Sequence, residues 1–217
     1  MAEVLFPFDW RAHHPQPNSH YLRETLAHTL GITDSRERAP ADARLLDDLV
    51  RFFERQEVAP GRCLEASGEA WKNVYVLEQG IARLYRQSPE GKVCIHHFFR
   101  EGDMMWPVFA RSRSTRNTLC LASVEPCSLW VAPFDLFRRL LQKTDHWNRF
   151  ALVLTEQLAE QALMREVEQQ TLSALDRYRH MVSDYPELVE RVPDYQLAAW
   201  LGVASATFSR LKHQGVE

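Results

Sequence analysis

The chain has 217 residues, of which 45% are hydrophobic and 25% are charged, and its formal net charge is −3. This composition lies near the globular average and excludes disordered, collagen-like and low-complexity proteins. The charge also excludes a uniformly basic, histone-like binder, although it leaves room for a small basic reading domain on a neutral body. No apolar run approaches the ~18 residues of a membrane span, and the start lacks the basic residues of a signal peptide. We therefore expect a cytoplasmic protein with no membrane partner.

Residues 1–40 are predicted to be an irregular N-terminal extension, because prolines interrupt them repeatedly. Within them, only the stretch from Tyr21 to Leu30 has helical spacing. From about Ala41 to Arg55 the apolar side chains form one broad face, which predicts a helix. The cysteines are widely spaced, with no C-x-x-C pair, so we expect reduced thiols and neither a zinc site nor an iron–sulfur cluster. They are Cys63, Cys94, Cys120 and Cys127.

Short β-type segments, separated by turn-forming residues, follow as far as Pro133. Pro89 and Gly91 suit the turn of a hairpin that spans residues 81–99. Segments of this length and spacing predict an antiparallel sandwich or barrel over residues 41–144. The predicted strands are residues 74–77, 81–85, 93–99, 119–124 and 127–132.

From Pro133 onward the pattern is helical, with a short helix over residues 134–141 and a second, long helix over 145–183 that Asp145 can cap. A helix of ~38 residues would be about 57 Å long, too long for one side of a small domain. We therefore expect it to pair with a copy of itself. The apolar face that would form the dimer seam is interrupted by polar residues in its middle. The helix could therefore lie across the sandwich instead. The predicted dimer seam is Ala151, Leu154, Leu158, Leu172 and Leu175.

Residues 184–217 carry the most specific pattern: a short helix capped by Asp194, a turn at Gly202 and a second short helix. This order is typical of a helix-turn-helix, whose second helix enters the major groove of DNA. An ordinary pair of packed helices is the alternative. The outward face of the second helix favours DNA binding, because it carries hydroxyl and cationic groups and no carboxylate. The residues expected to face inward are Leu197, Ala198, Leu201, Phe208 and Leu211.

Arg210 is the residue that we expect to read a guanine. The groups expected to contact phosphates are Tyr195, Thr207, Ser209 and Lys212, with Ser205 and His213 on the same outward face. Only Arg210 and Lys212 carry fixed positive charge after Val192, so non-specific affinity should be weak and binding should need both heads of a dimer. Glu217 lies six residues past Leu211, so we expect no β-hairpin wing.

Together these features resemble the Crp/Fnr family of bacterial regulators. The matching stretches are Asn73–Tyr85, Gly91–Lys92, Glu101–Asp103 and Val192–Lys212, and the likeness covers about residues 45–213. The resemblance implies an α+β protein with an antiparallel, jelly-roll-like β-roll sensor domain, a long dimerisation helix and a small C-terminal helix-turn-helix domain. It also implies a homodimer whose partners are double-stranded DNA, RNA polymerase and a small-molecule effector of unknown identity. No motif points to an enzyme.

Cyclic-nucleotide members of this family carry a Gly-Glu pair for the ribose and an Arg-Ser or Arg-Thr pair for the phosphate. Here Trp106-Pro107 and Asn117-Thr118 stand in those places. The loss of a carboxylate and of a guanidinium fork removes the strongest contacts, so we expect cyclic AMP not to bind, or to bind feebly. A one-residue slip would bring Arg116 into the phosphate role. The expected effector pocket is therefore Trp106, Arg116, Asn117 and Thr118.

Haem-binding members use a histidine or cysteine ligand, and His96-His97 invites comparison with them. Adjacent strand residues point to opposite faces, so at most one of these histidines should face into the roll, and we expect no metal, haem or other cofactor. The alternative function is a ligand-binding or protein-interaction module with a vestigial DNA-binding head. The missing wing favours it, as does Ala204–Thr207, which replaces the family's Thr-Pro-Glu-Thr.

Overall fold

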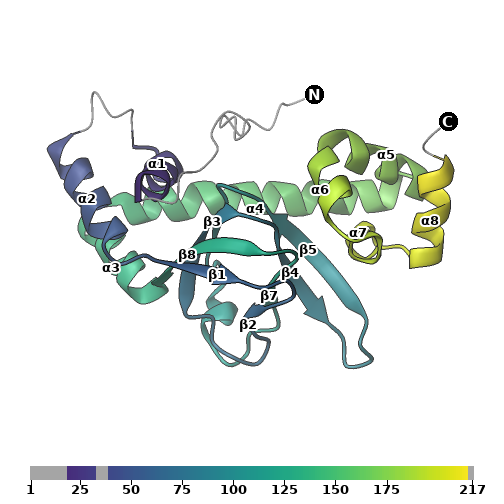
Figure 1. Ribbon diagram of the computed structural model, residues 1–217, viewed down its shortest axis with the longest axis horizontal. Coiled ribbons are helices and arrows are strands. Elements are labelled where there is room, and N and C mark those ends of the chain that lie inside the picture. The colour runs from purple at the N-terminus through teal and green to yellow at the C-terminus, as the bar shows by residue number, and fades with distance from the viewer. Residues whose placement is uncertain (1–18, 33–38, 215–217) are drawn as a thin grey trace.

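The computed structural model describes residues 19–32 and 39–214. As predicted, this is an α+β protein in which two antiparallel sheets form a β-roll. One long helix, α4 (His146–Thr171), runs beside the roll, with further helices at both ends of the molecule (Figure 1). None of the described helices combines the length and the apolar character needed to cross a membrane.

Each sheet of the roll has four strands, in the orders β1-β8-β3-β6 and β2-β7-β4-β5. The strands of the first are β1 (Glu54–Val58), β3 (Asn73–Gln79), β6 (Met104–Met105) and β8 (Cys127–Pro133). Those of the second are β2 (Cys63–Glu65), β4 (Ala82–Gln87), β5 (Val93–Phe99) and β7 (Cys120–Ser123). The predicted hairpin is confirmed, because β4 and β5 pair antiparallel and Gly91 turns between them with φ 84°.

Three strands, β1, β2 and β6, were not predicted. Strand β1 is almost wholly exposed and has the sequence ERQEV, so it lacks the apolar alternation by which a strand is found. Its pairing with β8 also shortens the preceding helix. That helix, α2 (Pro40–Val50), was expected to continue to Arg55, but Arg55 lies opposite Trp130 in the sheet.

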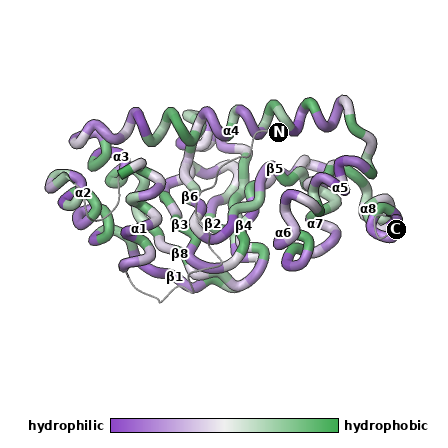
Figure 2. The backbone as a smooth tube through the Cα atoms, turned by 90° about the horizontal axis from the view of Figure 1, so that it is seen from above, coloured by the Kyte–Doolittle hydropathy of each residue, from purple (hydrophilic) through white to green (hydrophobic). Residues whose placement is uncertain are grey.

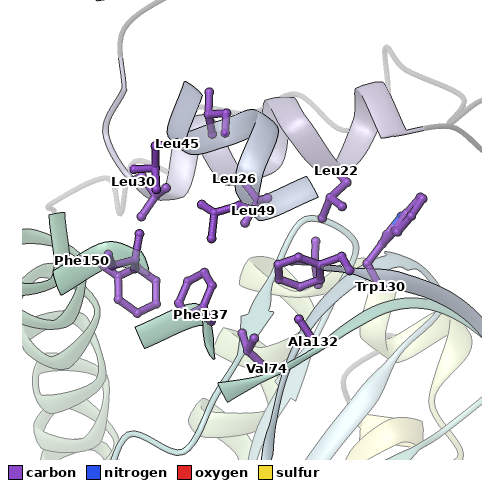
Figure 3. Close-up of a cluster of buried hydrophobic side chains, with 14 of the residues drawn as sticks. Leu22, Leu26, Leu30, Leu45, Leu49, Val74, Trp130, Ala132, Phe137 and Phe150 are labelled. Carbon is purple, nitrogen blue, oxygen red and sulfur yellow. The ribbon is translucent and has the colours of Figure 1, made fainter. Parts of the chain in front are cut away.

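The helical spacing noted from Tyr21 to Leu30 is confirmed by helix α1 (Ser19–Thr29), so the described part of residues 1–40 is not the irregular extension that was predicted. Helix α1 brings Leu22 and Leu26 into the core, and Leu30 follows directly after it. Figure 3 shows these side chains packed with residues of α2, α3 (Phe134–Lys143), α4 and the first sheet. Residues 1–18 and 33–38 of the predicted extension lie outside the described residues.

The prediction of one continuous helix over residues 145–183 is also wrong. Helix α4 ends at Thr171, after 26 residues, and the backbone at Leu172 is extended. Ser173 then begins α5 (Ala174–Asp184), because its Oγ accepts a hydrogen bond from the backbone N–H of Asp176 at 3.2 Å. At the other end, Asp145 precedes α4 in a left-handed conformation and its side chain caps nothing.

The predicted dimer seam faces this chain's own core, because α4 lies across the roll. Ala151 and Leu154 pack against the cluster of Figure 3, and Leu158 lines the cavity described below. Leu172 follows the end of α4, and Leu175 packs within the C-terminal helices. Figure 2 shows that the described elements lie on one side of α4 only. The opposite face of α4 exposes Leu152, Val153, Leu163, Met164 and Val167.

The C-terminal helices form a compact unit, which we call the head: α5, α6 (Pro186–Arg191), α7 (Asp194–Leu201) and α8 (Ser205–Gln214). The head shares an apolar cluster with β5, to which Ile95 and Phe98 contribute. The ring of Phe98 meets that of Trp200 in α7 edge to face, with centroids 5.4 Å apart. The head is therefore docked on the second sheet.

Candidate functional site

The turn between α7 and α8 has the predicted geometry. Gly202 is left-handed, with φ 77°, and the backbone N–H of Val203 donates to the carbonyl of Ala198 at 3.0 Å. The residues predicted to face inward are all buried: Leu197, Ala198, Leu201, Phe208 and Leu211. The ring of Phe208 packs edge to face on Tyr178 of α5, which anchors α8 in the head.

The opposite face of α8 is open to solvent. Its exposed residues include Ser205, Ser209, Arg210, Lys212 and His213, while Thr207 is half-buried and Tyr195 of α7 is 60% exposed. The Arg210 guanidinium donates to the Thr207 hydroxyl at 3.3 Å, which turns it along the helix surface. The side chains predicted to contact DNA therefore gather on one surface.

Lys212, which is predicted to contact a phosphate, has a carboxylate partner within this chain. Its Nζ lies 3.0 Å from both carboxylate oxygens of Asp194, so this chain already supplies its counter-ion. Asp194 in turn is not the N-cap of α7, which is Pro193. Of the two fixed positive charges on α8, only Arg210 has no carboxylate beside it among the described residues.

A cavity of about 750 Å³ lies between the second sheet, the segment from Asp103 to Leu119, and α4. Of the predicted pocket residues, Trp106, Asn117 and Thr118 line it and Arg116 does not. The backbone carbonyl of Arg116 instead accepts from Nε of Arg111, and it is Arg111 that lines the cavity.

The three predicted pocket residues that line the cavity are held in place by contacts within the fold. Trp106 is buried and stacks on Phe134 with ring centroids 6.0 Å apart. The Asn117 amide donates to the carbonyls of Ala66 and Leu119, at 3.1 and 3.0 Å, which fixes the turn. The Thr118 hydroxyl accepts from the Arg86 guanidinium at 2.8 Å. Neither Trp106 nor Asn117 supplies the carboxylate or guanidinium that would bind the ribose or the phosphate of a cyclic nucleotide.

Three cationic side chains that were not among the predicted pocket residues also line the cavity: Arg86, Arg111 and Arg165. Arg86 follows Leu84 by two residues on β4, so strand alternation places both side chains on the face that lines the cavity. This alternation could have predicted Arg86 from the sequence. Arg165 is one of the polar residues in the middle of the predicted dimer seam, but whether it faces the roll depends on how α4 crosses it.

Both His96 and His97 line the cavity, so the expectation that at most one faces the roll is wrong. The register shifts between Leu84 and Tyr85, which lie opposite His97 and Ile95, so His96 is an extra residue in a β-bulge. Burial, together with the charges of Arg165 and Arg100, lowers the pKa of His97 to about 4. His97 is therefore neutral at neutral pH. The described residues include no group of three His, Cys, Asp or Glu side chains that would hold a metal ion.

Two carboxyl groups, those of Asp103 and Glu166, balance part of the positive charge of the cavity. Burial raises the pKa of Asp103 to about 6, although the backbone N–H of Arg100 donates to its Oδ2 at 2.7 Å. With three guanidinium groups against two carboxyls, the cavity favours a negatively charged occupant.

The cyclic nucleotide-binding domain family matches residues 55–144 of the chain. In structure, the chain is similar to the c-di-GMP-responsive global regulator CLP of Xanthomonas campestris, with a TM-score of 0.65, 14% identity, and 79% of this chain and 90% of that chain covered. FixK2 of Bradyrhizobium japonicum is similar with a TM-score of 0.62 and 15% identity, and the match covers 75% of this chain and 83% of that chain. For a putative Crp/Fnr regulator of Eubacterium rectale the TM-score is 0.63 and the identity 15%, and the match covers 81% of this chain and 82% of that chain.

The chain has the Crp/Fnr fold. Residues 55–144, which include most of the β-roll, are similar to the cyclic nucleotide-binding domain family. The predicted Crp/Fnr resemblance is thus confirmed, and two of the structures that share this fold are named as regulators. No match was found among curated protein sequences. At 14–15% identity, likeness within the Crp/Fnr fold establishes architecture and leaves the ligand and the DNA site to be argued from the residues.

Proposed function

We propose that this protein is a sequence-specific, DNA-binding transcription regulator that acts as a homodimer. The observation that carries the proposal is the outward face of α8, where Ser205, Ser209 and Arg210 are exposed and to which the helix itself contributes no carboxylate. An arginine can donate two hydrogen bonds to one guanine, and hydroxyl groups suit phosphates. The tight turn at Gly202 holds α8 against α7 so that this face projects from the head.

The proposed dimer forms through the outer face of α4. Its five exposed large apolar side chains follow the helix from Leu152 to Val167, and no described element covers them. An exposed apolar stripe of this length is typical of a protein–protein interface. A second copy placed there by a two-fold axis would present two α8 helices to successive major grooves, about 34 Å apart.

The proposed regulator responds to an effector other than cyclic AMP. Trp106 is committed to an aromatic cluster and Asn117 to a turn, so the two positions that hold the ribose and the cyclic phosphate in cyclic-nucleotide members supply neither a carboxylate nor a guanidinium here. Isothermal titration calorimetry with cyclic AMP should show no binding in the micromolar range. A micromolar dissociation constant would contradict this part of the proposal.

The second candidate function is a ligand-binding module whose head no longer binds DNA. The ion pair between Lys212 and Asp194 favours it, because it removes one phosphate-directed cation from α8. Since exposed ion pairs are worth about 1 kcal/mol or less, a phosphate can displace Asp194, and we prefer the DNA-binding proposal.

Selection from a pool of random DNA duplexes tests this choice. The full chain is incubated with the pool, bound duplexes are recovered over several rounds, and the enriched sequences are aligned. We expect a two-fold symmetric site whose half-sites lie one helical turn apart. Failure to enrich any sequence, with the chain folded by circular dichroism, would favour the ligand-binding module.

A further inference from the structure

Arg165 lies where the effector cavity meets the head. It extends from α4 and lines the cavity, yet its guanidinium also donates to three backbone carbonyls. Nη1 donates to His96 of β5, and Nη2 donates to Ile95 of β5 at 3.3 Å and to Trp200 of α7 at 3.1 Å. The same guanidinium lies 5.7 Å from the centre of the Trp200 ring. One side chain thus contacts the cavity, the second sheet and the head.

This half-buried cation forms no salt bridge within the described residues. Burial lowers the pKa of Arg165, and the charge of Glu168 offsets this only in part. A partly buried charge without a paired counter-ion is costly, and three carbonyl dipoles compensate it only in part. An anion in the cavity would supply the missing charge.

The rest of the cavity points to the chemistry of that anion. Apolar groups form most of the wall, among them Trp71, Phe99, Trp106, Leu119 and Leu158. A volume of about 750 Å³ is in the range of small-molecule sites. We propose that the cavity binds an organic anion with an apolar body, such as a carboxylate or sulfonate, whose acidic group pairs with Arg165. This inference rests on the proposed function, because it names the effector class of the same regulator.

The geometry of the guanidinium links this binding to the head. Five N–H groups are available on an arginine, and Arg165 uses one of Nη1 and both of Nη2. The free N–H groups are on Nε and Nη1, which do not share an edge of the guanidinium. A bidentate anion therefore needs a hydrogen of Nη2 and must displace the carbonyl of Ile95 or Trp200. Occupation of the cavity consequently removes a bond from α4 to β5 or to α7, and release of the Trp200 carbonyl would loosen the contact between α4 and α7.

A matched pair of fluorescent probes tests the binding. 8-Anilinonaphthalene-1-sulfonate and N-phenyl-1-naphthylamine have the same aromatic body, and only the first is an anion. Both are titrated into the full chain and into Arg165→Gln, Arg165→Lys and Leu158→Trp. Arg139→Gln, which removes an exposed arginine from α3, is the control for net charge.

The sulfonate should bind the wild-type chain and Arg139→Gln alike, and Arg165→Gln about ten- to hundredfold more weakly. The neutral probe should bind Arg165→Gln as it binds the wild type, which also shows that the cavity is intact. Arg165→Lys should recover part of the sulfonate affinity, and Leu158→Trp should abolish binding of both probes by filling the cavity. Equal sulfonate affinity in wild type and Arg165→Gln, or undiminished binding to Leu158→Trp, would overturn the proposal.

Hydrogen exchange tests the link to the head. With the sulfonate bound, amides of α7 (residues 194–201) should exchange at least severalfold faster in the wild type, and amides of α2 should be unchanged. In Arg165→Gln, α7 should exchange faster already without the probe. Unchanged α7 exchange on saturation of the wild type would overturn the link. Neither experiment uses DNA, so a failed selection of a DNA site and a failed anion site are separate results.

Discussion

Asp103 and His97 line the same cavity and respond to pH in opposite directions. In the folded chain Asp103 keeps its proton up to about pH 6, whereas an ordinary aspartate with a pKa of 3.8 loses it at lower pH. The contribution of Asp103 to stability is therefore lost as the pH rises through about 6. The pKa of His97 falls from 6.5 to about 4, so its contribution is lost as the pH falls through that window.

Substitution of each residue should reveal these opposite dependences of stability on pH. Asp103→Asn keeps an oxygen for the Arg100 N–H and removes the ionisation, so its free energy of unfolding relative to wild type should increase by roughly 2–3 kcal/mol between pH 4 and pH 7. For His97→Gln the free energy of unfolding relative to wild type should instead be higher at pH 4 than at pH 7. Urea unfolding of the three proteins at both pH values measures this, and a pH-independent difference between variant and wild type would refute the assignment.

Arg210 and Lys212 are both exposed cations of α8, but only Lys212 has a carboxylate partner within the described residues. On the selected DNA site, Arg210→Ala should cost about 1–3 kcal/mol of binding free energy and relax specificity at one position in each half-site. Lys212→Ala should cost less and act equally on all sequences, because it loses only a phosphate contact that Asp194 already competes for. Competition binding with single-base variants of the site distinguishes the two. Unchanged affinity in Arg210→Ala would remove it as the reading residue.

Among the elements, the short stretch that separates α4 from α5 depends on Ser173. Ser173→Ala removes the side-chain cap on the Asp176 N–H, so the free energy of unfolding should fall by about 1 kcal/mol. Ser183→Ala, at an exposed position in the last turn of the same helix, is the matched control and should have little effect. Chemical unfolding of both variants measures the difference. Equal stability of the two would mean that the cap does not define the start of α5.

The elements that could be predicted from sequence are those whose own pattern is strong. Leu197, Ala198 and Phe208 were found because helical spacing marks an inward face, and the β4–β5 hairpin because Gly91 marks a turn. Strand β1 could not be found, since its partner β8 supplies the apolar residues. The seam of α4 was assigned to a second chain because spacing shows that a face is apolar and not what covers it.

The cavity was only partly predictable for a related reason. Trp106, Asn117 and Thr118 were found because they stand where the resembling family has its ligand contacts. The bulge that brings both His96 and His97 to the cavity is a register shift that a single strand does not encode. Arg165 comes from an element far along the chain, so only the packing of α4 on the roll reveals it.

The proposed homodimer requires that the outer face of α4 pairs two copies of the chain. Leu163→Glu places a charge in the middle of the exposed apolar stripe and should convert a dimer to a monomer at micromolar concentration. Gln142→Glu adds the same charge at an exposed position on α3 and should leave the dimer intact. Sedimentation velocity of the two variants measures the mass. A wild-type chain that sediments as a monomer, or an unaffected Leu163→Glu dimer, would exclude this interface.

The central claim is that the head of this molecule binds DNA, in spite of a net charge of −3 on the chain. The most direct test is a fluorescence-polarisation titration of the selected duplex at about 50 and 200 mM salt, with Arg210→Ala in parallel. Since each phosphate contact releases a counter-ion, the wild-type affinity should fall about tenfold or more across this range. Affinity that does not change with salt, or that is equal in wild type and Arg210→Ala, would contradict the claim.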